Sequence, residues 1–299
     1  MQAKWWETQS NNGERQARCS LCVHNCIVPQ GKEGYCGVRF FDGEKLFSPL
    51  LGRFCSLAID PIEKKPLYHW QPGTSILSLG SLGCTMRCPF CQNHSIAQPD
   101  KDEKNRIALT SLTAEDIVNK ARSHGLTSVA YTYNEPALQA EYILAAAPVL
   151  KKAGLATVLV SNGMYSEALL HAFCACVDAV NIDYKCHTAK DYARLGGSLE
   201  TVRRSIAALH SAGVHVEVTT LIVPGVSDNP EGFAETVHWL ADVSETIPLH
   251  ISRYRPAFKY TAPPTDVELL LHFAAIAKVR LKNVHIGNVP YLRGQAAAK

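Results

Sequence analysis

The stretch Cys84-Thr-Met-Arg-Cys88-Pro-Phe-Cys91 places three cysteines, here called the cysteine trio, within eight residues at C-x3-C-x2-C spacing. It follows an apolar run, residues 75–80, that is typical of a buried strand. Cysteine thiolates hold iron–sulfur clusters, and a cubane cluster usually takes four of them. Three close cysteines without a fourth nearby therefore predict a cluster with one iron open to another ligand. Two simpler interpretations are a structural zinc knuckle and buried thiols that only pack.

The cysteine trio resembles the signature of the radical S-adenosylmethionine (SAM) superfamily, in which an aromatic residue, here Phe90, precedes the last cysteine. Further stretches are similar to the branch related to pyruvate formate-lyase activating enzyme, and most of all to its AmmeMemoRadiSam group: residues 60–67, 91–96, 131–136, 248–253 and 286–289. The resemblance covers roughly residues 19–290. It implies a 4Fe-4S cluster on the trio, SAM bound at the open iron, and Phe90 beside these cofactors.

The composition narrows the functional classes. The 299 residues carry a formal net charge of +3, and 19% of them are charged. This near balance argues against a dedicated nucleic-acid binder, for which a more basic chain is expected. The first residues contain no apolar signal core, and no run of about 18 apolar residues that could span a membrane occurs. We therefore expect a cytoplasmic protein, in which clustered cysteines more often bind metal than form disulfides.

A second group of cysteines precedes the trio. Cys19, Cys22, Cys26 and Cys36, here called the cysteine quartet, have C-x2-C-x3-C-x9-C spacing among turn residues. Four thiolates satisfy a tetrahedral zinc site and equally an auxiliary iron–sulfur cluster, and unbound thiols are the third alternative. We expect His24 to lie beside this site without binding the metal. The remaining cysteines are expected to pack: Cys55, Cys174, Cys176 and Cys186.

The chain divides into three parts. We expect a cysteine-rich extension at residues 1–74, a barrel at 75–290 and a tail at 291–299. The first 18 residues are polar and predict a flexible lead-in. From its composition, Glu63-Lys64-Lys65 is interpreted as a solvated charged turn.

From residue 75 the apolar pattern alternates between strands and helices. Strands are expected at residues 75–80, 127–132, 156–161, 178–183, 214–222, 248–253 and 283–287. Helices are expected at residues 113–123, 137–152, 165–175, 199–212, 231–242 and 265–280. Repeated βα units need a parallel sheet with right-handed crossovers. The fold class is therefore α/β, and the family resemblance implies a radical SAM (βα)6 partial TIM barrel behind the cysteine-rich extension.

Polar residues follow successive predicted strands, at the carboxyl ends where α/β barrels carry their functional groups. The resemblance implies that Glu135 accepts the amine of SAM. Asn134 stands where the family has a glycine, so it is the looser assignment. Ser161 and Asn162 match a Thr-Asn-Gly motif whose members contact the SAM carboxylate.

Two later strands complete the implied SAM site. Asp183 and Lys185 form an Asp-x-Lys motif, and Lys185 would neutralise the carboxylate of SAM. His250 matches a histidine that touches the ribose or sulfonium side of SAM in the activating enzymes.

These features predict a radical SAM enzyme, with the trio as the catalytic centre that cleaves SAM reductively and generates a 5′-deoxyadenosyl radical. That radical would abstract hydrogen from a substrate. The resemblance favours an activating-enzyme-like oxidoreductase that installs a glycyl radical on a protein substrate. Modification of a peptide or a small molecule is the alternative among enzymes. An electron donor such as flavodoxin or ferredoxin would reduce the cluster. A rival from another class is a non-catalytic metal-binding module, which would be a colourless zinc protein without SAM cleavage.

Overall fold

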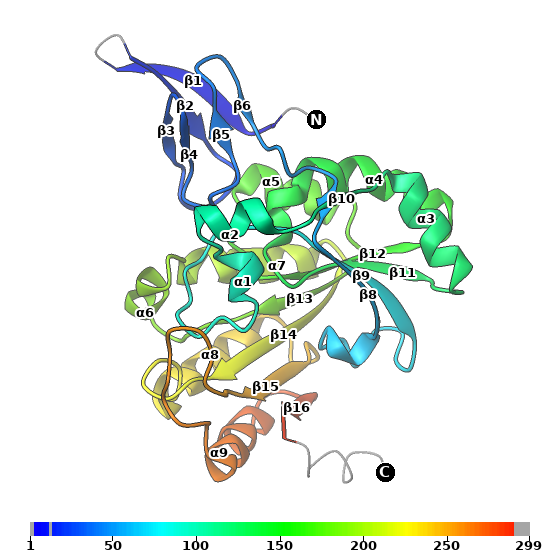
Figure 1. Ribbon diagram of the computed structural model, residues 1–299. Helices are drawn as coiled ribbons and strands as arrows, with labels where there is room; N and C mark the ends of the chain where they lie inside the picture. Colours follow the sequence, from blue (N-terminus) through cyan, green and yellow to red (C-terminus); the bar gives the residue numbers. More distant parts are fainter. Residues whose placement is uncertain (1–2, 12–13, 290–299) are drawn as a thin grey trace.

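One eight-stranded sheet organises the chain, and the computed structural model describes residues 3–11 and 14–289 (Figure 1). The strand order is β16-β15-β14-β13-β12-β11-β9-β8, and all neighbours are parallel except the antiparallel pair β8–β9. The strands are β8 (Ser56–Pro61), β9 (Ser75–Gly80), β11 (Ser128–Tyr131), β12 (Ala156–Ser161), β13 (Ala179–Asp183), β14 (His215–Ile222), β15 (Leu249–Arg253) and β16 (Val284–Gly287). In the described residues β8 and β16 do not pair, so the barrel stays open between them. The predicted α/β partial barrel is confirmed.

Six long helices connect the parallel strands. They are α3 (Ala114–Ser123), α4 (Ala140–Lys152), α5 (Glu167–Cys174), α7 (Leu199–Ser211), α8 (Pro230–Val243) and α9 (Val267–Lys278). Several begin at a side chain that accepts a backbone N–H of the first turn, as Thr113 does for α3 and Ser198 for α7. Such caps satisfy donors that have no partner within the helix. The predicted helices are confirmed to within a few residues at each end.

Shorter helical elements were not predicted separately, because three to six residues are too few to show a helical period. They are α1 (His94–Ala97), α2 (Lys101–Arg106), α6 (Ala189–Arg194) and the 3-10 turns η1 (Ile62–Lys64) and η2 (Pro136–Gln139). Helices α1 and α2 follow the trio, on the side to which the strand arrows point in Figure 1. In the described residues no helix is long and apolar enough to cross a membrane.

The extension before the barrel consists of small antiparallel sheets. One contains β1 (Trp6–Asn11), β2 (Glu14–Cys19) and β3 (Ile27–Pro29), and another contains β4 (Lys32–Glu33), β5 (Phe40–Phe41) and β6 (Leu46–Phe47). A short ladder joins β7 (Arg53–Phe54) to β10 (Thr110–Ser111). The prediction of a flexible lead-in is therefore wrong for the described residues. The polar composition of these residues did not indicate a strand, because only alternate side chains of β2, such as Ala17, are buried.

The predicted boundary between extension and barrel falls inside the main sheet. Strand β8 comes from residues assigned to the extension, yet it pairs with β9 over six residues. The tail predicted at residues 291–299 lies outside the described residues.

The segment between β8 and β9 crosses the open barrel and reaches its far side. Asn181 of β13 donates its Nδ2 to the Pro66 carbonyl at 2.8 Å, and Glu217 of β14 accepts the backbone N–H groups of Tyr68 and His69 at 3.0 and 2.8 Å. Inward-facing apolar residues of four strands pack against this segment: Ile76, Ala130, Val158 and Ala179. We call residues 62–74 the floor segment.

The floor segment contradicts the interpretation of Glu63-Lys64-Lys65 as a solvated turn. Lys64 is 64% exposed, but the side chain of Lys65 is only 2% exposed. Lys65 bonds to Asp60 Oδ2 at 2.6 Å, and its ammonium lies 4.4 Å from the centre of the Tyr133 ring. A buried charge needs such partners, and their positions depend on contacts across the barrel that local composition does not record.

Candidate active site

The trio lies in the loop after β9, and all three thiols are free. Cys84 Sγ accepts the Met86 N–H at 3.4 Å, and the Asn93 N–H is directed at the Cys91 sulfur. Burial raises the pKa of Cys88 to about 11, although Lys185 lowers it, and the nearby Cys91 thiol raises it further. These contacts show that the thiols lie within electrostatic range of one another and that backbone donors face two of the sulfurs.

This donor set fits an iron–sulfur cluster, since thiolates close together in a buried loop require a cation between them. In the part of the chain that the structure describes, no three Cys, His, Asp or Glu side chains are arranged as ligands of a single metal ion. A cubane cluster distributes its thiolates over separate iron atoms, so such convergence is not what it requires.

Glu135 occupies a buried position just after β11. Its Oε1 accepts the Ser161 hydroxyl at 2.8 Å and the Ala137 N–H at 3.0 Å, and its Oε2 accepts the Asn162 N–H at 3.0 Å. Burial raises the pKa of Glu135 to about 7, although these three hydrogen bonds lower it. The pKa of this carboxyl group lies near neutral pH, and the group is hydrogen-bonded to Ser161 and Asn162 at the end of β12. Such a group can accept a hydrogen bond from an ammonium group.

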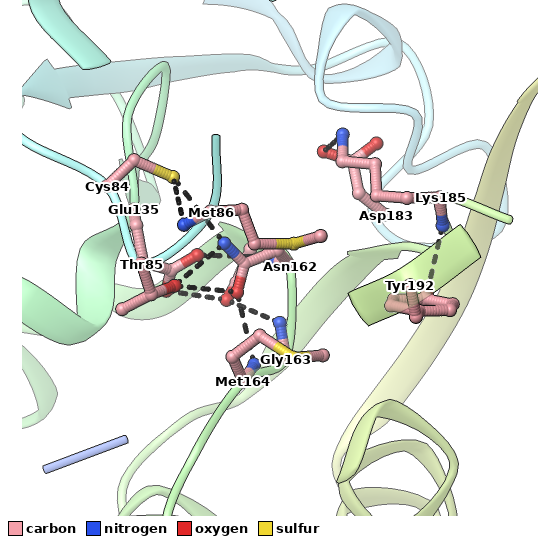
Figure 2. A network of polar contacts seen from close by, with 11 residues as sticks. Cys84, Thr85, Met86, Glu135, Asn162, Gly163, Met164, Asp183, Lys185 and Tyr192 are labelled. Carbon is pink, nitrogen blue, oxygen red and sulfur yellow. Dashed lines mark hydrogen bonds and ion pairs between the residues drawn. The ribbon is translucent and has the colours of Figure 1, made fainter. Parts of the chain in front are cut away.

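Asn162 joins the end of β12 to the trio. Its Nδ2 is 3.6 Å from Cys84 Sγ and 3.0 Å from Thr85 Oγ1, while its Oδ1 accepts the Met164 N–H at 3.1 Å. Figure 2 shows Asn162 between Cys84 and Met164. Glu135, Ser161, Asn162 and Cys84 of the trio therefore meet in one hydrogen-bonded network.

The Asp183–Lys185 pair lies on the other side of the trio. Lys185 Nζ is 3.0 Å from Asp183 Oδ2, and the Lys185 backbone N–H donates to the Tyr192 hydroxyl at 2.9 Å (Figure 2). Burial opposes the charged form of Lys185, but Asp183 and the thiols of Cys88 and Cys91 raise its pKa above the ordinary value. The Lys185 ammonium is thus placed within electrostatic range of the cluster loop.

His250 stands apart from this network. It is the second residue of β15, and its Nε2 is 2.6 Å from Glu217 Oε2. Its ring packs edge-on against Tyr68 of the floor segment at 4.7 Å and stacks on His285 at 5.1 Å. In the strand register His250 lies beside Thr219, which lies beside Asp183. The structure therefore places His250 in the barrel interior, next to the floor segment.

Asn134 hydrogen-bonds to the loop that precedes the trio, and Phe90 packs against another aromatic ring. Asn134 Oδ1 accepts the Ser81 N–H at 2.9 Å and its Nδ2 donates to the Gly83 carbonyl at 3.0 Å. Both polar atoms of the amide therefore hold the loop that leads to the trio. Phe90 is buried and packs edge-on against Tyr260 at 6.1 Å.

Sequence reasoning missed several residues of this site. Thr85 lies between the first two cysteines and bonds to Asn162, and Glu217 gathers four donors, including His215 Nε2 at 2.9 Å. Lys65 and Tyr133 each donate a hydrogen bond to the Asp60 carboxylate. One signal was available, because Glu217 is a charged residue in the middle of an apolar strand pattern.

The matches to known proteins agree with this geometry. The model of the radical SAM superfamily matches residues 79–240. The chain is 37% identical over 298 residues to the uncharacterized protein MJ0808 of Methanocaldococcus jannaschii, and this match covers 98% of the chain and 87% of that protein. The chain therefore belongs to the radical SAM superfamily, whose members are enzymes, and this membership implies a 4Fe-4S cluster and SAM as cofactors.

More distant similarities support the same assignment. The putative glycyl-radical enzyme activating enzyme MJ1227 of the same organism is 24% identical over 224 residues, which cover 69% of this chain and 86% of that protein. The structure of Streptococcus suis SuiB bound to S-adenosylmethionine is similar with a TM-score of 0.55 at 14% identity, over 73% of this chain and 51% of SuiB. The structure of QueE from Escherichia coli has a TM-score of 0.50 at 12% identity, over 79% and 94% of the two chains. This chain thus spans about half the length of SuiB, and these two structures share its fold.

Proposed function

We propose that this protein cleaves SAM reductively at the trio and uses the resulting radical to abstract hydrogen from a substrate at the barrel mouth. The observation that carries the proposal is the network in which Asn162 contacts both Cys84 and Thr85, while its backbone N–H is held by Glu135. It couples the cluster loop to the ends of two neighbouring strands. A ligand seated there would contact the cluster and the polar strand ends together.

The chain itself binds and orients the cofactors. When bound, the reduced cluster supplies the electron that cleaves the C5′–S bond of SAM to methionine and a 5′-deoxyadenosyl radical. Glu135 accepts the amine of SAM, Asn162 orients the carboxylate, and the Lys185 ammonium neutralises that carboxylate. The buried position of Glu135 and Asn162 excludes water from the reacting centre. The contribution of the protein is therefore positioning.

The first experiment measures SAM cleavage. The anaerobically reconstituted protein, reduced with dithionite, should produce 5′-deoxyadenosine and methionine. Cys88→Ser should abolish both products and lower the iron content, because the cluster loses a thiolate ligand. Cys174→Ser, on the outer helix α5, is the matched control and should behave as the wild type. A fully reconstituted protein that leaves SAM intact would refute the proposal in favour of a non-catalytic metal module.

For the substrate, we propose activation of a glycyl-radical protein, with an external donor such as flavodoxin or ferredoxin supplying the electron. The similarity to the putative activating enzyme MJ1227 supports this choice. Modification of a peptide or a small molecule remains the alternative, because one fold serves many reactions.

Deuterium transfer separates these substrates. Extracts of cells grown on glycine deuterated at Cα are fractionated by size and incubated with the reduced enzyme. Activation of a glycyl-radical protein should place deuterium in 5′-deoxyadenosine with the high-mass fraction only. Deuterium from the low-mass fraction, or none from the glycine-labelled proteins, would overturn the activating role and leave SAM cleavage standing.

A further inference from the structure

The cysteine quartet is gathered by two turns of the extension. The first turn connects β2 to β3, where the Cys19 N–H donates to the Cys26 carbonyl at 2.8 Å and the Asn25 N–H to the Cys22 carbonyl at 3.2 Å. The second turn carries Cys36 and closes with a bond from the Gly37 N–H to the Gly34 carbonyl at 2.9 Å. Cys22 lies within electrostatic range of the other three thiols, and all four are free.

Two sulfurs of the quartet also face a hydrogen-bond donor. The Tyr35 N–H donates to Cys26 Sγ at 3.4 Å, and the guanidinium of Arg39 is 3.9 Å from Cys19 Sγ. Donors directed at sulfur stabilise thiolates, which are the form that binds metal.

The same two turns hold the loop of the trio. His24 Nε2 is 2.6 Å from the Thr85 carbonyl oxygen, and its ring stacks on Tyr35 at 3.9 Å. Arg87 donates to the Tyr35 carbonyl and lies over the Tyr35 ring at 4.5 Å. Burial raises the pKa of the Tyr35 hydroxyl, and the nearby thiols of Cys84 and Cys26 both raise it further. The stacked side chains of His24 and Tyr35 therefore connect the quartet turns to the trio loop.

We propose that the cysteine quartet binds a metal centre through four thiolates, and that this centre fixes His24 and Tyr35 against the trio loop. The chemical class is an iron–sulfur cluster, because no three side chains of the described residues are arranged as ligands of a single metal ion, and a cubane cluster distributes its thiolates over separate iron atoms. His24 lies between Cys22 and Cys26, Tyr35 precedes Cys36, and these two residues contact Thr85 and Arg87 of the trio loop. Loss of the quartet metal is therefore expected to loosen the packing around the trio loop. The proposal that the quartet binds a metal does not depend on the proposed function, whereas the proposed effect on the trio rests on it.

The first test removes the trio and measures what remains. Full-length protein with Cys84, Cys88 and Cys91 changed to alanine is loaded anaerobically, with iron and sulfide in one sample and with zinc in another. We expect one iron–sulfur cluster per chain in the sample loaded with iron and sulfide, and its loss when Cys22 and Cys26 are also changed to alanine. Circular dichroism and gel filtration establish that both variants are folded. A folded trio variant that binds zinc but no iron–sulfur cluster, or that binds neither, would overturn the proposal.

The second test keeps the trio and measures its cluster by electron paramagnetic resonance and iron analysis. Loss of the quartet metal in Cys22→Ser/Cys26→Ser should change the spectrum of the reduced trio cluster and lower its occupancy several-fold, whereas Cys174→Ser should not. Tyr35→Ala keeps all four cysteines and should change the same spectrum while the second metal stays bound. Tyr35→Phe retains the ring and should leave the spectrum as in the wild type. Unchanged spectra in both Tyr35→Ala and the quartet variant would refute the coupling, even if the second metal is confirmed.

Discussion

At the scale of single residues, Glu135 combines burial with a position at the centre of the site. Its folded-state pKa of about 7 lies above the ordinary 4.5. The protonated carboxyl is therefore favoured by folding, so the stabilisation is present below pH 4.5 and is lost as pH rises through about 7. A bound SAM amine would reverse this preference, because a nearby positive charge favours the carboxylate.

Glu135 therefore makes SAM binding dependent on pH. We expect the dissociation constant of SAM to fall as pH rises through about 7, because the amine then meets a carboxylate. Glu135→Gln should weaken binding and remove this dependence. Anaerobic equilibrium dialysis of both proteins across this pH range measures the effect. Parallel pH profiles in the two proteins would show that another group controls binding.

Glu217 is a second residue on which the barrel interior depends. Its carboxylate accepts bonds from the floor segment, from His215 and from His250, and these lower its pKa to about 2 despite burial. Its contribution to stability is present above the ordinary 4.5 and is lost as pH falls toward 2.

Glu217→Gln should reduce the free energy of unfolding at neutral pH by about 1–3 kcal/mol, since buried donors lose an acceptor. The variant should also lose part of the wild-type dependence of stability on acid pH. Urea unfolding at pH 7 and near pH 4 measures both effects. Equal unfolding midpoints for variant and wild type at pH 7 would contradict the assigned role of the carboxylate.

At the scale of elements, the loop after β9 fits closely against the extension. Gly83 has φ +85°, and a Cβ at this position would lie 2.8 Å from the Cys36 carbonyl oxygen and would also contact Val38. Glycine is required here by the positive φ angle. It is also required because the turn that carries Cys36 leaves no room for a Cβ atom.

Gly83→Ala should therefore separate the extension from the trio loop and lower cluster occupancy. We expect it to be less stable by about 1–3 kcal/mol than the matched variant Gly154→Ala, which has a similar φ of +78° but no atom within 4 Å. Iron content and unfolding midpoints of the two variants measure the difference. Equal values would show that backbone strain alone accounts for the effect.

At the scale of the whole molecule, a buried ion pair fastens the extension to the barrel. The guanidinium of Arg39 contacts the Glu141 carboxylate of α4, and both side chains are 1% exposed. Arg39 also donates to the Lys4 carbonyl at 2.7 Å, and Glu141 accepts the Lys4 N–H at 2.7 Å. The pair thus joins three distant segments of chain at one point.

Arg39→Ala should lower the free energy of unfolding by about 3–5 kcal/mol, because Glu141 is left as an unpaired buried charge. The double variant Arg39→Met/Glu141→Gln should recover part of this loss, since no charge remains to be compensated. Urea unfolding followed by circular dichroism measures both. A single variant as stable as wild type would show that the pair does not fasten the two parts.

Local patterns were sufficient for the strand–helix alternation from residue 75 onward, because the period of apolar residues reports which face of each element is buried. Glu135, Ser161 and Asn162 could be predicted together because parallel strands bring their carboxyl ends to one edge. The first strands and Lys65 could not be predicted, since their burial depends on partners far away in the chain.

The sequence by itself determined the cysteine trio, its place after a buried strand and the polar strand ends near it, because these depend on spacing and period. Only the tertiary structure decided that the quartet turns lie against the trio through His24 and Tyr35. It alone also placed His250 on Glu217, above a floor segment that carries a buried lysine. Such contacts join residues far apart in the chain, and their positions follow from how the sheet, the floor segment and the extension pack.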